Sequence, residues 1–102
     1  MAGLNSHIRI LVLEISFDLE HCYSLKDKRR IRQSLIEKMK RRYNVSVIES
    51  DLQDDYRKLE LAVTYVALNE GTAHEMVDKI HNFCLSQTVG AASRVDLFHE
   101  IL

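Results

Sequence analysis

The chain has 102 residues, 46% of them hydrophobic and 28% charged, with a formal net charge of −1. This length fits a single domain, and this composition is typical of a globular protein rather than a disordered one. No window approaches the ~18 consecutive apolar residues of a membrane-spanning helix, and the start, MAGLNSH, lacks the features of a secretory signal. We therefore expect one cytoplasmic domain over residues 1–102, without membrane association and with residues 1–6 as a flexible N-terminal extension.

The first strand is expected over residues 7–19. Its odd positions from 11 to 19 are all apolar, which is the period-two pattern of a strand that packs on a core. Its even positions begin apolar, with Ile8, Ile10 and Val12, and then become polar. One face of the strand therefore packs on the core along its whole length, and the other face is apolar for only half of it.

A strongly basic helix is expected over residues 24–44, with the hydroxyl of Ser24 as its N-cap. Nine basic and two acidic residues give this segment a charge of +7, and five basic and thirteen acidic residues give the rest of the chain −8. At ~100° per residue, the apolar side chains fall on one side of the helix. Lys28 and Arg32 fall on that same side, so we expect them to overhang the sheet edge, to snorkel or to meet a carboxylate.

Two further strands are expected over residues 45–50 and 59–69, on either side of an acidic loop over residues 51–56. The first of these strands is rich in β-branched residues. The second is apolar on nearly all positions of both alternating rows. Such a pattern is typical of a strand in the centre of a sheet.

A second helix is expected after a break at Gly71, with Thr72 and Glu75 as a capping box, and it is expected to run to about Ser86. A glycine-containing turn then leads to a fourth strand over residues 94–102, whose apolar residues alternate with charged ones.

The order strand, helix, strand, strand, helix, strand predicts a ferredoxin-like α+β fold. In this fold a four-stranded antiparallel sheet carries both helices on one face, because the crossover connections are right-handed. The expected strand order is 4-1-3-2, which places the first and third strands in the centre. A different α+β arrangement is the alternative interpretation.

The basic residues of the first helix are the main candidates for a binding site. Lys and Arg neutralise phosphates and release counterions, which is the main sequence-independent source of nucleic-acid affinity. The alternative is a solvated helix face that the acidic remainder of the domain balances. The candidate contacts are Lys26, Lys28, Arg29, Arg30 and Arg32, extended by Lys40, Arg41 and Arg42.

The open face of the predicted sheet is a second candidate surface. Base stacking is not expected there, because the open-face rows of the first and third strands contain no aromatic residue. Their apolar residues would form a larger patch than a monomer usually exposes, and a second copy packed on it as a homodimer would cover it. The alternative is that residues 1–6 fold over the patch. The predicted interface residues are Ile8, Ile10, Val12, Val66 and Leu68.

No catalytic, metal or cofactor site is predicted. The five His and two Cys lack the paired spacing of a zinc site. Cys22 beside His21 lacks the further groups that an activated nucleophile requires. The acidic loop lacks the spacing of an EF-hand, and the three isolated glycines form no phosphate-binding loop. We therefore expect no enzymatic activity.

The run SLKDKRR at residues 24–30, followed by SLI at 34–36 and YNVSV at 43–47, resembles the YlxP-like family of small bacterial proteins of unknown biochemical function. The resemblance covers nearly the whole chain from about residue 8 and implies a ferredoxin-like fold. Members tend to be encoded beside translation and ribosome-maturation factors, which implies a role near ribosomal RNA. The chain departs from the family at Tyr56, where the family usually has Trp.

These observations together predict a non-enzymatic protein that binds RNA or a ribosomal particle through its basic first helix. The alternative is a dimeric protein-interaction or small-ligand regulatory module that acts through the sheet face, with the basic helix as a solubilising surface. Charge reversal in the helix separates the two hypotheses, because it should abolish the first function and spare the second.

Overall fold

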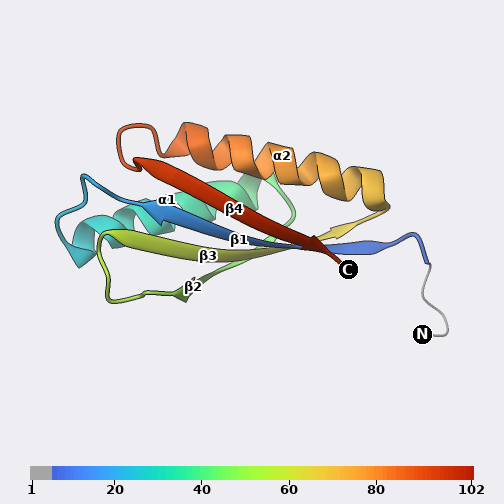
Figure 1. Ribbon diagram of the computed structural model, residues 1–102, viewed down its shortest axis with the longest axis horizontal. Helices are drawn as coiled ribbons and strands as arrows, with labels where there is room; N and C mark the ends of the chain where they lie inside the picture. Colours follow the sequence, from blue (N-terminus) through green and yellow to red (C-terminus); the bar gives the residue numbers. More distant parts are fainter. Residues whose placement is uncertain (1–5) are drawn as a thin grey trace.

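A computed structural model describes residues 6–102, and residues 1–5 of the predicted extension lie outside the described part. Its elements are β1 (Arg9–Asp18), α1 (Leu25–Arg42), β2 (Ser46–Asp51), β3 (Lys58–Ala67), α2 (Glu70–Gln87) and β4 (Arg94–Ile101). The four strands form one antiparallel sheet in the order β2-β3-β1-β4 (Figure 1). The predicted ferredoxin-like fold and its strand order are therefore confirmed. No helix in the described part is long and apolar enough to cross a membrane.

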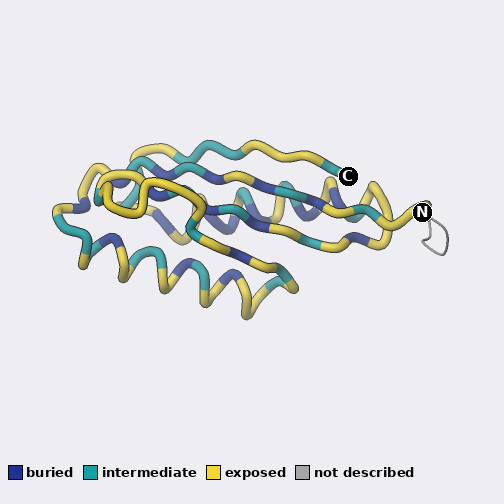
Figure 2. The backbone as a smooth tube through the Cα atoms, turned by 90° about the horizontal axis from the view of Figure 1, so that it is seen from below, coloured by how far each residue is buried: buried dark blue, intermediate teal, exposed yellow. Residues whose placement is uncertain are grey.

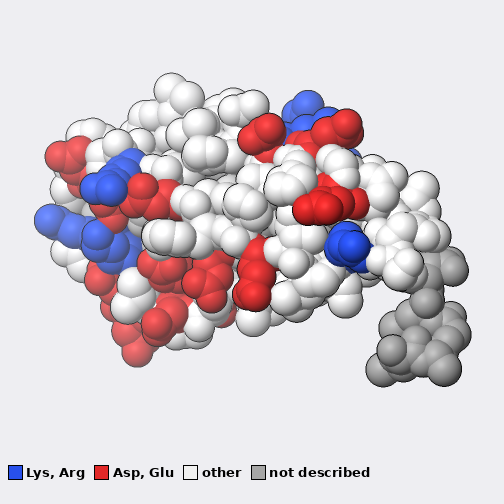
Figure 3. Space-filling model, turned by 45° about the vertical axis from the view of Figure 1, so that its right-hand side comes forward, with Lys and Arg blue, Asp and Glu red and all other residues white. Residues whose placement is uncertain are grey.

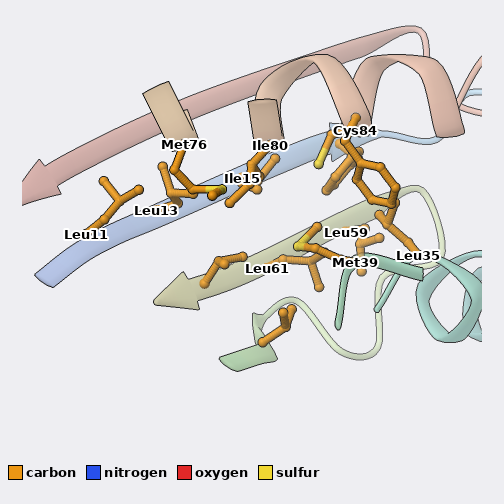
Figure 4. Packing of buried hydrophobic residues seen from close by; sticks show 14 of the residues in the cluster. Leu11, Leu13, Ile15, Leu35, Met39, Leu59, Leu61, Met76, Ile80 and Cys84 are labelled. Carbon is orange, nitrogen blue, oxygen red and sulfur yellow. The ribbon is translucent and has the colours of Figure 1, made fainter. Parts of the chain in front are cut away.

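The core lies between the sheet and the two helices. Buried and more exposed residues alternate along β1 and β3 (Figure 2), and the odd-numbered row of each strand is the buried one. Leu35 and Met39 of α1 and Ile80 of α2 point toward this row (Figure 4), so both helices cover the same face of the sheet. Burial of each such side chain contributes about 1.5–3 kcal/mol relative to exposure. The even-numbered rows are left on the open face.

Both helices begin at a side-chain cap, but only the first cap is the predicted one. Ser24 Oγ accepts a hydrogen bond from the Asp27 backbone N–H at 3.1 Å, as expected. At α2 the predicted capping box is wrong, because Asn69 Oδ1 accepts from the Thr72 N–H at 2.9 Å. Asn is at least as good an N-cap as Thr. The helix therefore starts earlier than expected, and Gly71 lies in its first turn instead of breaking the chain.

Candidate nucleic-acid interface

The exposed side of α1 carries cations at both of its ends. Arg29 and Lys40 are eleven residues apart, as are Arg30 and Arg41, and eleven residues are three turns and a rise of about 16 Å. Both pairs therefore share one side of the helix, and Lys26 lies between them around its axis. We call these five exposed residues the basic face: Lys26, Arg29, Arg30, Lys40 and Arg41.

In the described part of the chain, the five cations of the basic face form no ion pair, in contrast to four other cations of the domain. Lys58 pairs with Asp18, and Arg94 pairs with Asp96 at 2.7 Å. Within residues 6–102, no residue of the basic face forms such a pair. The carboxylate of Glu37 lies between the two ends of the face and accepts a hydrogen bond from a neighbouring glutamine. The basic face is thus two groups of unpaired cations separated by one acid.

Lys28 is not part of this face, which corrects the predicted contact set. Its side chain is 1% exposed, and its ammonium donates to the carbonyl oxygens of Leu52 at 2.6 Å and Asp55 at 2.8 Å. It also forms an ion pair with Glu49 Oε2 at 2.9 Å. A buried ammonium with these partners cannot reach a phosphate. The helical pattern had placed Lys28 on the apolar side, and its meeting with a carboxylate is confirmed.

Arg32 shares the same carboxylate. Its Nη1 donates to Glu49 Oε1 at 2.8 Å, and its side chain is only partly exposed. Burial raises the pKa of the Glu49 carboxyl, but the hydrogen bonds and charges of Lys28 and Arg32 outweigh burial, so the pKa lies below its ordinary value. We call Lys28, Arg32 and Glu49 the Glu49 clasp. It joins α1 to β2 and to the loop that follows β2. Arg32 contacts Glu49 through Nη1, and its side chain remains partly exposed to solvent.

Arg42 lies on the flank of α1 that faces α2. Its guanidinium is 5.7 Å from the ring centroid of Tyr43 and 6.0 Å from that of Phe83, within cation–π range. The two rings meet edge to face, with their centroids 5.6 Å apart. Arg42 is exposed. These contacts place it beside the basic face, where it can extend a contact made by Arg41.

The acidic loop between β2 and β3 is organised around the Glu49 clasp. Leu52 has a positive φ of 56°, a conformation that costs a non-glycine residue about 1 kcal/mol, and its carbonyl accepts from Lys28. Asp51 Oδ1 accepts from the Leu52 N–H, and Asp55 Oδ1 accepts from the Arg57 N–H. The carboxylates of Asp51 and Asp55 thus close local turns. In residues 6–102 no cluster of three possible metal ligands is found.

The predicted dimer-interface residues lie together on the open face of the sheet. Ile10 is opposite Val66 in the β1–β3 register, and it exchanges two backbone hydrogen bonds with Leu102. Val12 is half-buried, whereas Ile8, Ile10, Val66 and Leu68 are exposed. Sequence reasoning missed three exposed apolar residues of this face, although strand alternation could have found them. They are Ile48, Phe98 and Leu102.

Comparisons with known proteins support the fold and leave the activity open. A family model described as "Protein of unknown function (DUF503)" matches residues 10–96. The de novo designed protein Foldit4 is 17% identical with a TM-score of 0.51, over 91% of this chain and 96% of that one. Protein SO0527 from Shewanella oneidensis is 15% identical with a TM-score of 0.48, over 96% and 95%. A search of curated proteins finds no match.

Proposed function

We propose that this chain, which belongs to the DUF503 family of proteins of unknown function, binds structured RNA through the basic face of α1 and has no enzymatic activity. The observation that carries the proposal is the concentration of unpaired cations on one side of α1. The basic face gathers five exposed cations without an ion pair in the described residues on one side of one helix, whereas Lys58 and Arg94 of the sheet are paired. Unpaired cations can neutralise phosphates without first giving up a carboxylate partner.

The finer family identification supports RNA over other polyanions. We propose that the protein is YlxP-like, and the placement of that family beside translation and ribosome-maturation factors favours RNA, free or within a ribosomal particle, as the partner.

The layout of the basic face favours folded RNA over an extended single strand. Its two groups are about 16 Å apart along the helix, and Glu37 between them would repel a phosphate placed midway. Two separate backbone segments, such as the two strands of a duplex, fit this arrangement. Base stacking on the sheet has little support, because the exposed ring of Phe98 lies opposite Glu14 in the β1–β4 register.

The expected salt dependence follows from the number of cations. Each neutralised phosphate of a duplex contributes a slope of about −0.9 to log K against log salt, so five contacts give a slope of about −4 to −5. Affinity should then fall roughly 500-fold between 50 and 200 mM salt.

The test is the binding of a fluorescent RNA hairpin across a salt series. The variant Lys26→Glu/Arg29→Glu/Arg30→Glu reverses one group of the basic face and should lose most of the affinity and at least half of the salt slope. Absence of salt-dependent binding by the unaltered protein would contradict the proposal.

A matched control is available on other elements. The variant Arg57→Glu/Lys79→Glu/Arg94→Glu changes the net charge by the same amount but leaves the basic face intact. It should bind with nearly the original slope. An equal loss in the two variants would mean that overall charge, and not the basic face, governs binding.

A further inference from the structure

The open face of the sheet carries an apolar patch that nothing in the described residues covers. Seven large apolar side chains on this face are 39–71% exposed. They leave on the order of 500 Å² of apolar surface, at the upper end of the largest patch on an ordinary monomer, which is about 300–600 Å². We call them, together with half-buried Val12, the sheet-face patch. Its exposed members are Ile8, Ile10, Ile48, Val66, Leu68, Phe98 and Leu102.

Charges within and beside the patch restrict its partner. Glu100 lies opposite Val12, and Glu14 lies opposite Phe98. Figure 3 shows many acidic groups, with some basic ones among them, at the end of the molecule away from the termini, and further acidic groups beside uncharged areas elsewhere. These carboxylates would repel RNA phosphates or anionic lipid headgroups. The patch therefore fits a protein surface with an apolar centre.

We infer that this protein surface is a second copy of the chain, packed face to face with its twofold axis along the sheet between β1 and β3. This axis places β1 of one protomer over β3 of its partner, and β4 over β2. Two sheets pack in this aligned manner at about 10 Å and within about 30°. The homodimer does not depend on RNA binding, because the helices cover the opposite face of each sheet.

The register makes the patch complementary to itself under this axis. Ile10 comes to face the partner's Val66, because the two are opposite in the β1–β3 pairing. Phe98 of β4 pairs with Glu14, which pairs with Ala62, which pairs with Ile48 of β2. Phe98 and Ile48 therefore lie at the same height on the two outer strands, and the axis brings each to face the other in the partner.

One pair of polar groups matches as well, while Glu14 comes to face the small side chain of the partner's Ala62. Glu100 of β4 and Ser46 of β2 lie at the same height along the strands, because Glu100 pairs with Val12, Val12 with Thr64, and Thr64 with Ser46. Under the twofold axis the Glu100 carboxylate faces a serine hydroxyl that can donate to it. With these polar residues at its edge, the contact approaches the roughly 800 Å² per partner of a standard stable interface.

The first test is the mass of the full chain in solution by light scattering and sedimentation equilibrium. We expect twice the chain mass of 11.9 kDa. Val66→Glu should raise the dimer dissociation constant roughly 100-fold or more, because each dimer would have to bury two additional carboxylates, each against the partner's Ile10. Val89→Glu makes the same change at an exposed turn residue outside the patch and should leave the dimer intact. Circular dichroism would check that both variants fold.

The second test addresses the position of the axis. Ile48→Cys/Phe98→Cys places thiols on the two outer strands, about 14 Å apart within one protomer, but facing each other in the dimer. A short bismaleimide should join the two chains covalently, while the unaltered chain should not react because Cys22 and Cys84 are buried.

A monomer mass at all concentrations would overturn the inference. If removal of residues 1–6 then produced a dimer, those residues would be the occupant of the patch. Equal dissociation by Val66→Glu and Val89→Glu, or a dimer without cross-links, would overturn the proposed interface.

Discussion

Replacement of Lys28 by methionine should be far more damaging than the same replacement at Lys26, two residues earlier in the same helix. Lys28→Met keeps most of the side-chain volume but removes the ammonium that binds the Leu52 and Asp55 carbonyls and Glu49. The half-buried Glu49 carboxylate would then keep only Arg32 as a partner. Lys26 is exposed, so its replacement removes charge without disturbing the core.

The size of the effect follows from the contacts that are lost. Removing one partner of a buried ion pair typically costs 3–5 kcal/mol, and we take about 3 kcal/mol because Arg32 still neutralises Glu49. For a domain of about 100 residues, each kcal/mol lowers Tm by roughly 4–8 °C. Lys28→Met should therefore lower Tm by about 12–24 °C, and Lys26→Met by no more than about 4 °C.

Urea and thermal unfolding of both variants, read by circular dichroism, measure the difference. RNA binding gives the opposite ranking, because Lys26→Met should reduce the salt slope by about 0.9, whereas Lys28→Met should leave the slope unchanged at a temperature where it is folded. Equal stability of the two variants would refute the structural role of the Glu49 clasp. A loss of salt slope in folded Lys28→Met would mean that Lys28 does contact RNA.

Three further results are expected. Because the pKa of Glu49 is lowered below its ordinary value of 4.5, its contribution to stability is complete above that pH and is lost as the pH falls through the folded-state pKa. Urea unfolding between pH 3 and 7 should therefore show that the unfolding free energy of Glu49→Gln falls less steeply with decreasing pH than that of the unaltered protein. Asn69→Ala should cost about 1 kcal/mol of unfolding free energy, whereas Glu75→Ala should change it by less than about 0.5 kcal/mol. Burial raises the pKa of Cys84 to about 12, so its thiol should react with iodoacetamide at pH 8 only after denaturant is added, as mass spectrometry can show.

Most of the fold could be predicted because its signals are local. The period-two rows of β1 and β3 alternate without interruption, and the buried row is the predicted one. The start of α2 was mistaken because Asn69 and Thr72 are both good caps three residues apart. The choice of cap depends on where β3 ends. Because β3 ends at Ala67, Asn69 has an extended backbone and its side chain accepts from the first turn of α2.

The site was less predictable because its partners are distant in sequence. Helical spacing could show that Lys28 departs from the charged side, but Leu52 and Asp55 lie 24 and 27 residues away. A leucine gives no sign of the left-handed conformation that Leu52 adopts. Phe98 was overlooked for a different reason. It is a single apolar residue in a row of β4 that otherwise holds charged residues, so the pattern indicates a polar row, and the pairing with Glu14 places Phe98 on the open face.

The layered fold keeps the two proposed surfaces apart. The basic face lies on the outside of the helix layer, and the sheet-face patch lies on the open side of the sheet, so one can be occupied without obstructing the other. A face-to-face dimer would then present two basic faces on opposite outer sides. Such a dimer could join two RNA segments or two regions of one large particle, with an avidity that neither face has alone. A short hairpin could occupy only one face, so Val66→Glu should weaken binding to a long folded RNA much more than binding to a hairpin.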